Sequence, residues 1–335
     1  MVSRRYLGTL VMSSHTSVRW LFDCAAWQVS AQDWFKCLKS IQPEERERIG
    51  KFVFQNDATA SMVGRLLMRK LLVEYGTVPW RQLTILRSEK GKPYVQNMDH
   101  IVFNVSHHGR MVVLAAEIFQ QGDQGLFKTT ESAITTPSNT GSTPSDKRSS
   151  ATPPDSPKLQ LGVDICDHNL PRNTKIPEFF RLMRRNFHAQ EWDYILSPTL
   201  EHTQLNRFYR MWSLKESYVK ATGTGISVPL DEMCFHVMSE PGAERCVYDT
   251  RVSVQGRMQE QWLFEETRLK EKYCVAVALH GAMPETCDYF VDKSYESVNI
   301  EQVKCLMEDV ECQDEEEIFH EAQDFVKKQL RSWDS

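Results

Sequence analysis

A polar, low-complexity stretch at about residues 120–157 divides the chain into two parts that could each fold. Ser, Thr, Pro, Gly and Asp dominate this stretch, and large apolar side chains are nearly absent. Such a sequence cannot bury enough apolar surface to offset its ordering entropy, so we predict that it is disordered. Strands are expected on either side of it, at residues 111–117 and 159–165. We therefore interpret it as an insertion at a hairpin tip, where a longer loop costs little free energy of folding.

Composition excludes several classes of protein. The chain has 335 residues, of which 41% are hydrophobic and 25% charged, and this is ordinary for a globular protein. A net charge of −5 argues against a nucleic-acid binder, and the most apolar runs are too short to span a membrane. The nine cysteines show no zinc-knuckle spacing, and the N-terminus lacks the pattern of a secretory signal. We therefore expect reduced thiols and a cytosolic protein.

In the first half, helical and strand signals follow one another. Pro43 opens a helix with Glu44 and Glu45 in its first turn, where carboxylates suit the helix dipole. The pattern continues through Phe52 and Phe54 into residues 58–75, which we expect to be helical. Strands are expected at residues 83–86, 101–105 and 111–117.

The second half is predicted to begin with a strand at residues 159–165. Helices are expected at residues 177–187, 189–196 and 204–221, the last stopped by Gly223 and Gly225. Strands follow at residues 235–238, 252–254, 261–265 and 273–279, and no strand pattern is clear beyond Gly281. The predicted organisation is an N-terminal lobe (1–119), the insertion (120–157), a C-terminal lobe (158–282) and an acidic, partly helical, peripheral tail (283–335).

A carboxylate stands inside an otherwise apolar strand in the segment Leu161-Gly162-Val163-Asp164-Ile165. Burial of a carboxylate among apolar neighbours is costly unless a cation or a hydrogen-bond donor meets it. Asp164 could therefore face a metal ion. It could equally occupy a solvent-facing position of an alternating strand, and this motif alone does not decide between the two.

The predicted long helix carries the segment Trp212-Ser213-Leu214-Lys215-Glu216-Ser217-Tyr218-Val219-Lys220-Ala221. Glu216 and Lys220 are four residues apart, so they share one face of the helix. Taken in isolation, the pair is more typical of a surface ion pair than of a catalytic site. Trp212 lies one turn before Glu216, and we expect it to be a packing residue.

Two polar segments of the first half could bind a ligand. In Phe103-Asn104-Val105-Ser106-His107-His108-Gly109, polar side chains gather at the end of a strand, where they often address a ligand. In Arg87-Ser88-Glu89-Lys90-Gly91-Lys92-Pro93, three cations flank a glycine in a loop, which suits a phosphate. Solvated polar turns remain the alternative for both segments.

Together and in this order, the motifs resemble the 4′-phosphopantetheinyl transferases, specifically their monomeric eukaryotic type. The resemblance rests on residues 40–49 (Ser-Ile-Gln-Pro-Glu-Glu-Arg-Glu-Arg-Ile), on Gly162-Val163-Asp164-Ile165, and on Trp212-Ser213-Leu214-Lys215-Glu216-Ser217 followed by Lys220. It covers about residues 18–279 apart from the insertion. The pairing of G-x-D with a later W-x-x-K-E-x-x-x-K is specific, whereas each half alone is less so.

The resemblance implies a fold and a reaction. The expected fold is of the α/β (α+β) class, with two similar lobes related by a pseudo-twofold axis and the active site at their junction. The expected enzyme transfers 4′-phosphopantetheine from coenzyme A to a serine of an acyl or peptidyl carrier protein, releases 3′,5′-ADP and depends on Mg²⁺. Implied partners are the acyl carrier domain of fatty acid synthase, aminoadipate-semialdehyde dehydrogenase and the carrier domain of formyltetrahydrofolate dehydrogenase.

The resemblance also implies roles for single residues. Asp164 and Glu216 are the expected Mg²⁺ ligands, Glu216 is also a candidate base, and Lys220 is expected to stabilise charge on the diphosphate. These three residues are the expected catalytic group. Coenzyme A is expected to contact Arg48, Arg87, Ser88, Glu89, Lys90, Gly91, Lys92, Asn104, Val105, Ser106, His107, Asp164, Glu216, Ser217, Tyr218, Val219 and Lys220.

One position departs from many bacterial relatives, which have a third acidic residue where this chain has Cys166. A thiol is a poor ligand for Mg²⁺, so a water could replace it, and the identity of the general base stays open. Two other functions also stay open: a relative that binds coenzyme A or a carrier protein without transfer, and a scaffold that uses the insertion and the acidic tail.

Overall fold

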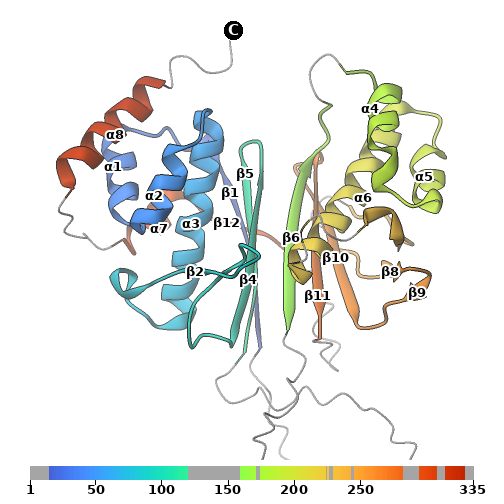
Figure 1. Ribbon diagram of the computed structural model, residues 1–335, viewed down its shortest axis with the longest axis horizontal. Helices are drawn as coiled ribbons and strands as arrows, with labels where there is room; N and C mark the ends of the chain where they lie inside the picture. The colour runs from blue at the N-terminus through green and yellow to red at the C-terminus, as the bar shows by residue number, and fades with distance from the viewer. Residues whose placement is uncertain are drawn as a thin grey trace, which may run out of the picture.

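The computed structural model describes residues 15–119, 159–170, 174–223, 225, 229–242, 245–281, 294–307 and 314–328. The chain is mixed α/β: two sheets stand side by side in the middle of the molecule, and helices cover the outer side of each (Figure 1). The stretch predicted to be disordered lies outside the described residues.

The first sheet has the strand order β12-β1-β5-β4, in which β12 (Glu296–Ser297) comes from the C-terminal part of the chain. The long helix α3 packs against β4 and β5, and a small β2–β3 hairpin stands beside it. The elements of this half are β1 (Thr16–Asp23), α1 (Ala31–Lys39), α2 (Pro43–Gly50), α3 (Gln55–Gly76), β2 (Leu86–Arg87), β3 (Pro93–Tyr94), β4 (Ile101–His108) and β5 (Met111–Ile118), with 3-10 turns at Cys24–Ala26 and Trp80–Gln82.

The predicted helix that begins at Pro43 is confirmed, but it does not continue into the next one. A capping box between Gln42 and Glu45 begins α2, which ends at Gly50. Phe54 has an extended backbone and forms the N-cap of α3, and Val53 beside it is 82% exposed. The apolar spacing that suggested one continuous helix therefore comes from side chains of a connecting loop.

The second half has a three-stranded sheet of order β10-β11-β6 and a smaller one of order β7-β8-β9. Helix α6 lies across β6 and β11. The elements are β6 (Gln160–Asp167), α4 (Ile176–Met183), α5 (Ala189–Leu196), α6 (Glu201–Thr222), β7 (Met233–His236), β8 (Arg251–Val254), β9 (Arg257–Met258), β10 (Trp262–Leu269) and β11 (Tyr273–His280), with 3-10 turns at Arg184–Asn186 and Leu230–Glu232.

Strands β5 and β6, which flank the insertion, do not form a hairpin, so that prediction was wrong. Strand β5 is paired on both edges, with β1 on one side and β4 on the other, and no edge is free for β6. Strand β6 pairs with β11 in the other sheet. The two sheets pack face to face through one apolar cluster, to which β5 contributes Val113 and Ala115 and β6 contributes Val163 and Ile165.

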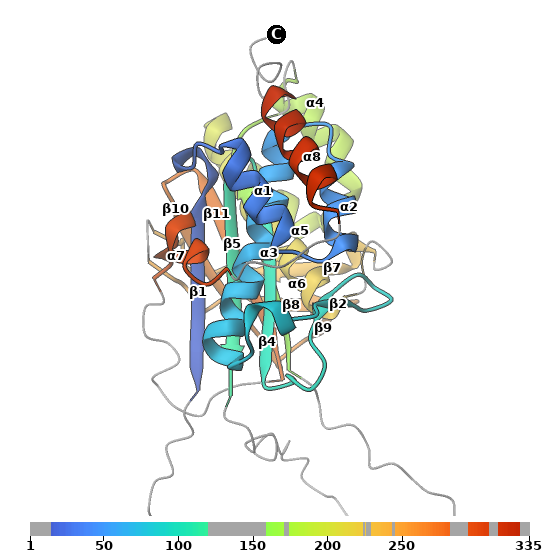
Figure 2. The same cartoon turned by 90° about the vertical axis from the view of Figure 1, so that its left-hand side faces the viewer.

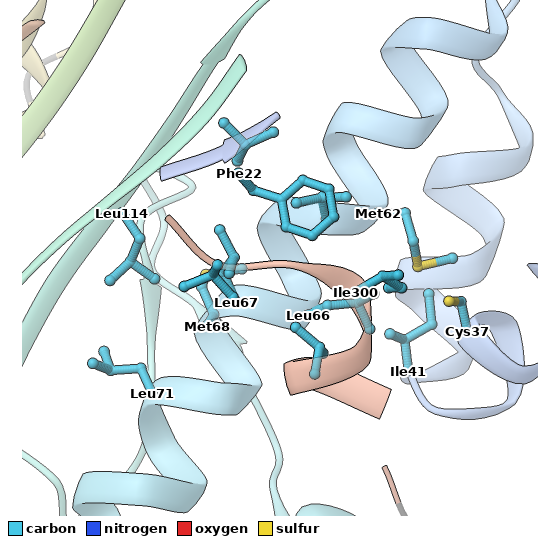
Figure 3. Close-up of a cluster of buried hydrophobic side chains, with 14 of the residues drawn as sticks. Phe22, Cys37, Ile41, Met62, Leu66, Leu67, Met68, Leu71, Leu114 and Ile300 are labelled. Atoms are coloured by element: carbon cyan, nitrogen blue, oxygen red, sulfur yellow. The ribbon is translucent and has the colours of Figure 1, made fainter. Parts of the chain in front are cut away.

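The C-terminal segment returns to the first half, although the sequence suggested a peripheral tail. Strand β12 (Glu296–Ser297) pairs in parallel with β1, and α7 (Ile300–Lys304) follows it. Ile300 and Val303 are buried in the first core, where Ile300 lies near Leu66 (Figure 3). Helix α8 (Glu315–Lys328) lies on α1 (Figure 2), and the rings of Trp34 and Phe325 stack with centroids 3.7 Å apart. A two-residue strand is too short to show a period in the sequence, which is why this segment was missed.

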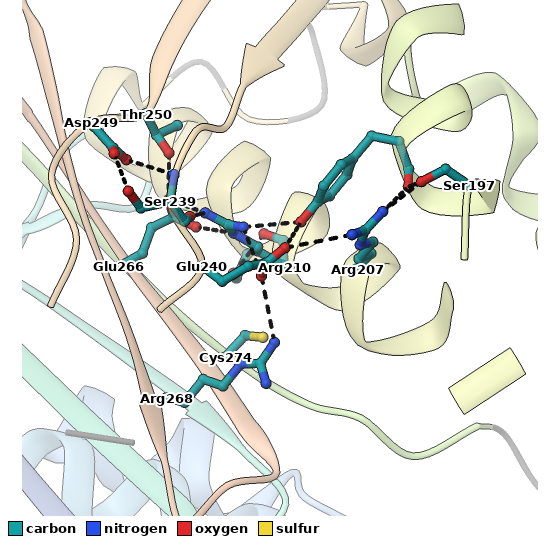
Figure 4. Close-up of polar contacts among 12 residues, drawn as sticks. Ser197, Arg207, Arg210, Ser239, Glu240, Asp249, Thr250, Glu266, Arg268 and Cys274 are labelled. Carbon is teal, nitrogen blue, oxygen red and sulfur yellow. Dashed lines mark hydrogen bonds and ion pairs between the residues drawn. The ribbon is translucent and has the colours of Figure 1, made fainter. Parts of the chain in front are cut away.

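Buried ion pairs tie the layers together. Arg210 of α6 donates to both carboxylate oxygens of Glu266 on β10, at 2.6 and 3.0 Å, within the polar network of Figure 4. Arg19 of β1 likewise donates to both oxygens of Glu265 on β10, at 2.7 and 2.9 Å, which links the two sheets. None of the described helices combines the length and the apolar character needed to cross a bilayer.

Candidate functional site

A pocket of about 360 Å³ lies where α3, β4 and the β2–β3 hairpin of the first half meet α6 of the second. It combines cations, one carboxylate and apolar side chains. Its lining residues are Met68, Arg87, Lys90, Gly91, Lys92, Pro93, Asn104, Val105, Glu216, Val219, Lys220, Gly223, Gly225 and Leu230.

Three polar side chains from three elements converge beside this pocket. The ammonium of Lys220 on α6 donates to Asp164 Oδ1 on β6 at 2.6 Å and to Ser106 Oγ on β4 at 2.7 Å. Ser106 in turn donates to Asp164 Oδ1 at 3.0 Å. Asp164 is 6% exposed, so the solvent-facing alternative for this position is wrong, and its buried carboxylate meets the ammonium of Lys220.

Cys166, two residues after Asp164 on β6, contributes to the same cluster. Its thiol donates to Asp164 Oδ2 at 3.1 Å. Burial and the nearby negative charge of Asp164 raise the pKa of the Cys166 thiol. The thiol therefore stays protonated and acts as a hydrogen-bond donor to the carboxylate that it neighbours.

Glu216 lines the pocket one turn before Lys220 on α6. Burial raises the pKa of its carboxyl group, and the charge of Asp164 raises it further, while Lys220 acts in the opposite direction. The ion pair within the helix that the four-residue spacing suggested is not formed, since Lys220 pairs with Asp164 instead. The charge of Asp164 beside the pocket therefore makes ionisation of Glu216 less favourable.

Helix α6 can reach Asp164 because β6 has a glycine at the crossing point. A Cβ atom on Gly162 would lie 2.1 Å from the carbonyl oxygen of Ser217 and 2.3 Å from the backbone nitrogen of Ala221. No other residue type fits such an approach without moving the helix. Gly162 therefore sets the distance between the strand that carries Asp164 and the helix that carries Glu216.

The β2–β3 hairpin packs against the C-terminal end of α6. The Lys92 ammonium donates to the carbonyl oxygen of Leu161 at 3.0 Å and to that of Ala221 at 3.3 Å, and burial lowers its pKa to about 8. The side chain of Lys90 lies over Gly223, the left-handed C-cap of α6. Arg87 donates from Nη1 to the carbonyl oxygen of Gly91 at 2.9 Å and closes the loop.

The end of β4 completes the site. The side-chain oxygen of Asn104 accepts from the backbone N–H of Val163 at 3.0 Å, which fastens β4 to β6 across the two sheets. His107 is exposed at the end of the strand, yet desolvation by neighbouring atoms and the charge of Lys220 lower its pKa. The imidazole is therefore mostly neutral near pH 7.

Comparisons with known proteins match this chain to one enzyme family. Two family models match the chain: "4'-phosphopantetheinyl transferase, N-terminal" over residues 25–119 and "4'-phosphopantetheinyl transferase superfamily" over residues 160–278. The human L-aminoadipate-semialdehyde dehydrogenase-phosphopantetheinyl transferase is 37% identical over 275 residues, or 80% of this chain and 76% of the relative. The chain belongs to the 4′-phosphopantetheinyl transferase family.

More distant phosphopantetheinyl transferases match over a similar length. The Xenopus laevis protein of the same name as the human one is 36% identical over 268 residues, or 78% of this chain and 76% of the relative. The 4'-phosphopantetheinyl transferase of Bacillus subtilis is 25% identical over 272 residues, or 81% of this chain and 95% of the relative. The chain is thus a transferase homologue over most of its length.

The structure brings together most of the residues that the family resemblance assigned. Nine of them line the pocket: Arg87, Lys90, Gly91, Lys92, Asn104, Val105, Glu216, Val219 and Lys220. Ser106 and Asp164 are hydrogen-bonded to Lys220, and Arg48, Ser88, Glu89 and His107 are exposed residues outside the lining set. Ser217 and Tyr218 face away from the pocket. Ser217 is fully buried, and the ring of Tyr218 lies 4.4 Å from that of Trp262 in the second core.

Three further residues, which the sequence did not assign to the site, line it or support it from behind. Met68 lines the pocket, but in the sequence it is one apolar position among many on α3. Lys215 is fully buried and pairs with Glu191 of α5 at 2.8 Å, and it also donates to two backbone carbonyls near β7. Lys215 therefore fixes the side of α6 that packs against α5 and β7. Trp212, expected to be a packing residue, lies in the second core near Phe208, as predicted.

Proposed function

We propose that this transferase moves the 4′-phosphopantetheine arm of coenzyme A onto a serine of an acyl or peptidyl carrier domain, and that the pocket between the two halves is its active site. The observation that carries the proposal is a pocket lined by Glu216, Lys220 and a cationic hairpin, with Asp164 hydrogen-bonded to Lys220 beside it. Cations suit the phosphates of coenzyme A, and the paired carboxylates suit proton transfer and a hard cation.

The reaction forms a bond from the serine oxygen to the phosphorus that bears the pantetheine arm, and it breaks the bond from that phosphorus to the diphosphate bridge. The serine proton goes to a base, and 3′,5′-ADP leaves. Glu216 is the candidate base, because its raised pKa brings a carboxylate closer to the range in which proton transfer is efficient. Lys220 is placed to stabilise the charge on the diphosphate and the leaving group.

Asp164 and Glu216 fit Mg²⁺, which prefers one or two carboxylates together with phosphate oxygens and water. Among the described residues no three His, Cys, Asp or Glu side chains form a ready metal site, so substrate phosphate and water complete the ligand set. When bound, the ion supplies charge neutralisation at the diphosphate. Cys166 is no ligand in this proposal, since its thiol stays protonated.

We also propose that the halves, taken as residues 1–119 and 158–282, are two lobes related by a pseudo-twofold axis. In support, each half has one helix of 22 residues laid against eight-residue antiparallel strands. Each of these helices, α3 and α6, ends in a left-handed residue, Thr77 at φ 54° and Gly223 at φ 62°. The pocket would then lie at the junction of two similar units.

The proposed acceptors are the carrier domains of fatty acid synthase, aminoadipate-semialdehyde dehydrogenase and formyltetrahydrofolate dehydrogenase. The name of the human relative supports the second of these. We propose that the enzyme acts as a monomer in the cytosol. The cysteines described in the structure are all free thiols, as expected for a reducing compartment.

The test is intact-mass spectrometry of an apo acyl carrier protein incubated with the enzyme, coenzyme A and Mg²⁺, with EDTA as the control. The proposal predicts that the carrier gains the mass of one phosphopantetheine and that EDTA prevents the gain. If several apo carriers gain no mass while the folded protein binds coenzyme A, the chain is instead a binding relative without transfer.

A further inference from the structure

Three side chains donate hydrogen bonds to the carboxylate of Asp164, and together they bond both of its oxygens. Oδ1 accepts from Lys220 Nζ at 2.6 Å and from Ser106 Oγ at 3.0 Å. Oδ2 accepts from Cys166 Sγ at 3.1 Å. The neutral donors are the more deeply buried ones: Ser106 is 5% and Cys166 2% exposed, whereas the side chain of Lys220 is 30% exposed. A molecule in the pocket therefore reaches the cation more easily than either neutral donor.

The two neutral donors are carried by paired strands from different halves of the chain. Ser106 lies on β4 opposite Val113 of β5, and Cys166 lies on β6 opposite Cys274 of β11. In serine and cysteine, one rotatable bond separates the backbone from the donor atom, and it occupies one of three staggered wells. Lysine has four such bonds, and more side-chain entropy is lost when it is held in one place. The sheets thus fix the hydroxyl and the thiol more firmly than α6 fixes the ammonium.

The proposed reaction changes the surroundings of Asp164. Lys220 lines the pocket and is assigned to the diphosphate, so its contact with Asp164 weakens when the substrate binds. Asp164 is 6% exposed, and a buried carboxylate that loses a donor is destabilised unless other donors remain. Ser106 and Cys166 leave one donor on each oxygen. Rotation of the carboxylate would then break a hydrogen bond at both ends.

We infer that Ser106 and Cys166 are positioning residues, which hold one oxygen each of Asp164 while Lys220 bonds to the diphosphate. The inference rests on the proposed function. It gives Ser106 a role through Asp164, in place of the contact with coenzyme A that the family resemblance implied. The hydroxyl is a stronger donor than the thiol, so Ser106 contributes the larger part. Donors that are fixed in advance keep a reacting group in its productive geometry.

The test measures kcat and the KM for coenzyme A in Ser106→Ala and in Cys166→Ala, with saturating Mg²⁺ and apo acyl carrier protein. We expect kcat to fall by about 10-fold in Ser106→Ala and by about threefold in Cys166→Ala, as for loss of one hydrogen bond to a charged group. The KM should change by less than about twofold, because neither residue is assigned to the substrate. Ser106→Cys and Cys166→Ser keep a donor of similar shape, and each should recover most of the lost kcat.

Two matched controls remove a hydroxyl or a thiol that does not touch Asp164. Ser213 is 1% exposed and donates to the carbonyl oxygen of Arg210, and Cys37 is fully buried in the first core. Ser213→Ala and Cys37→Ala should therefore leave kcat within about twofold of the wild type. An equal loss of kcat in these controls would make the effect one of packing, and it would overturn the inference.

Two further results would overturn it. A raised KM with unchanged kcat would make Ser106 or Cys166 a ligand of the substrate, and a failure of Ser106→Cys and Cys166→Ser to recover kcat would show that the donor is not what matters. A wild type that transfers to no carrier would instead contradict the proposed function. Urea denaturation then still tests the contacts, since it requires no transfer. The stability losses of Ser106→Ala and Asp164→Ala should not add in the double variant, and additive losses would contradict the bond between them.

Discussion

Lys220 Nζ lies 2.6 Å from Asp164 Oδ1, and this contact joins the last turn of α6 to the first strand of the second half. The same ammonium reaches Ser106 of β4, so one cation connects both sheets at the pocket. Because the side chain of Lys220 is only partly buried, it remains able to exchange partners when a phosphate enters. Its contact with Asp164 therefore holds a positive charge at the pocket before the substrate binds.

Lys220→Met should lower the transfer rate strongly, because no other side chain donates a charged hydrogen bond to both Asp164 and Ser106 within the described contacts. Charge stabilisation of this kind contributes roughly 10²-fold to 10³-fold to a rate. Turnover under saturating coenzyme A measures the effect. A Lys220→Met variant with more than about a tenth of wild-type turnover would contradict the role of Lys220.

Gly162→Ala should displace α6 and reduce both stability and activity. The added Cβ would lie 2.1 Å from a backbone oxygen, and neither backbone can yield without moving the strand or the helix. We expect a loss of about 3 kcal/mol or more in the free energy of unfolding, typical of severe overpacking. Gly50→Ala is the matched control, because nothing lies within 4 Å of its Cβ position. Urea denaturation of both variants checks the prediction, and similar stabilities would contradict it.

Stability should depend on pH through Glu216. The pKa of its carboxyl group is higher in the folded protein than in the unfolded chain. Folding is therefore coupled to the uptake of a proton at pH values between these two pKa values. The stability contributed by this proton is fully present below the unfolded pKa and is lost as pH rises through the folded pKa. Glu216→Gln should thus equal the wild type near pH 4 and exceed it in stability at pH 7, in EDTA without substrate. A difference that does not grow between these two pH values would contradict this account.

Arg19→Met should destabilise the contact between the two sheets. The substitution leaves Glu117 and Glu265, each about 1% exposed, without the guanidinium that both carboxylates contact. Removal of one partner from a buried ion pair costs about 3–5 kcal/mol. Lys51→Ala breaks the exposed pair with Glu47 and should cost less than about 1 kcal/mol. Thermal unfolding of the two variants compares them directly, and a small effect of Arg19→Met would mean that the sheets do not depend on this pair.

The sequence placed Asp164 on a strand, and Glu216 and Lys220 on a helix, because apolar periodicity and glycine stops are local signals. The family resemblance was needed to bring them together, since nothing local shows that β6 and α6 touch. The role of Gly162 depends on a close approach to the backbone of Ser217, which is 55 positions away in the chain. The periodicity of apolar residues along the sequence cannot indicate such a contact. The same holds for Lys92, whose charge suggested a phosphate but whose ammonium bonds to backbone carbonyls at the end of α6.

Strand pairing was the least predictable part of the fold. Strands β5 and β6 are adjacent once the insertion is set aside, and this suggested a hairpin. In the structure, β5 pairs with β1 and β6 pairs with β11. Both partners are distant in the sequence, so the pairing could not be predicted from the segments beside the insertion. Likewise, Ile300 and Val303 enter the first core through tertiary packing alone, because α7 has only five residues.

The central claim is that Asp164 and Glu216 carry the transfer. Its most direct test measures, in one reaction with Mg²⁺ and an apo acyl carrier protein, both the mass gained by the carrier and the 3′,5′-ADP released, for the wild type, Asp164→Ala and Glu216→Ala. Circular dichroism confirms that each variant is folded. The account predicts equal amounts of the two products with the wild type and neither product with the folded variants. Turnover near the wild-type level in either folded variant would contradict it.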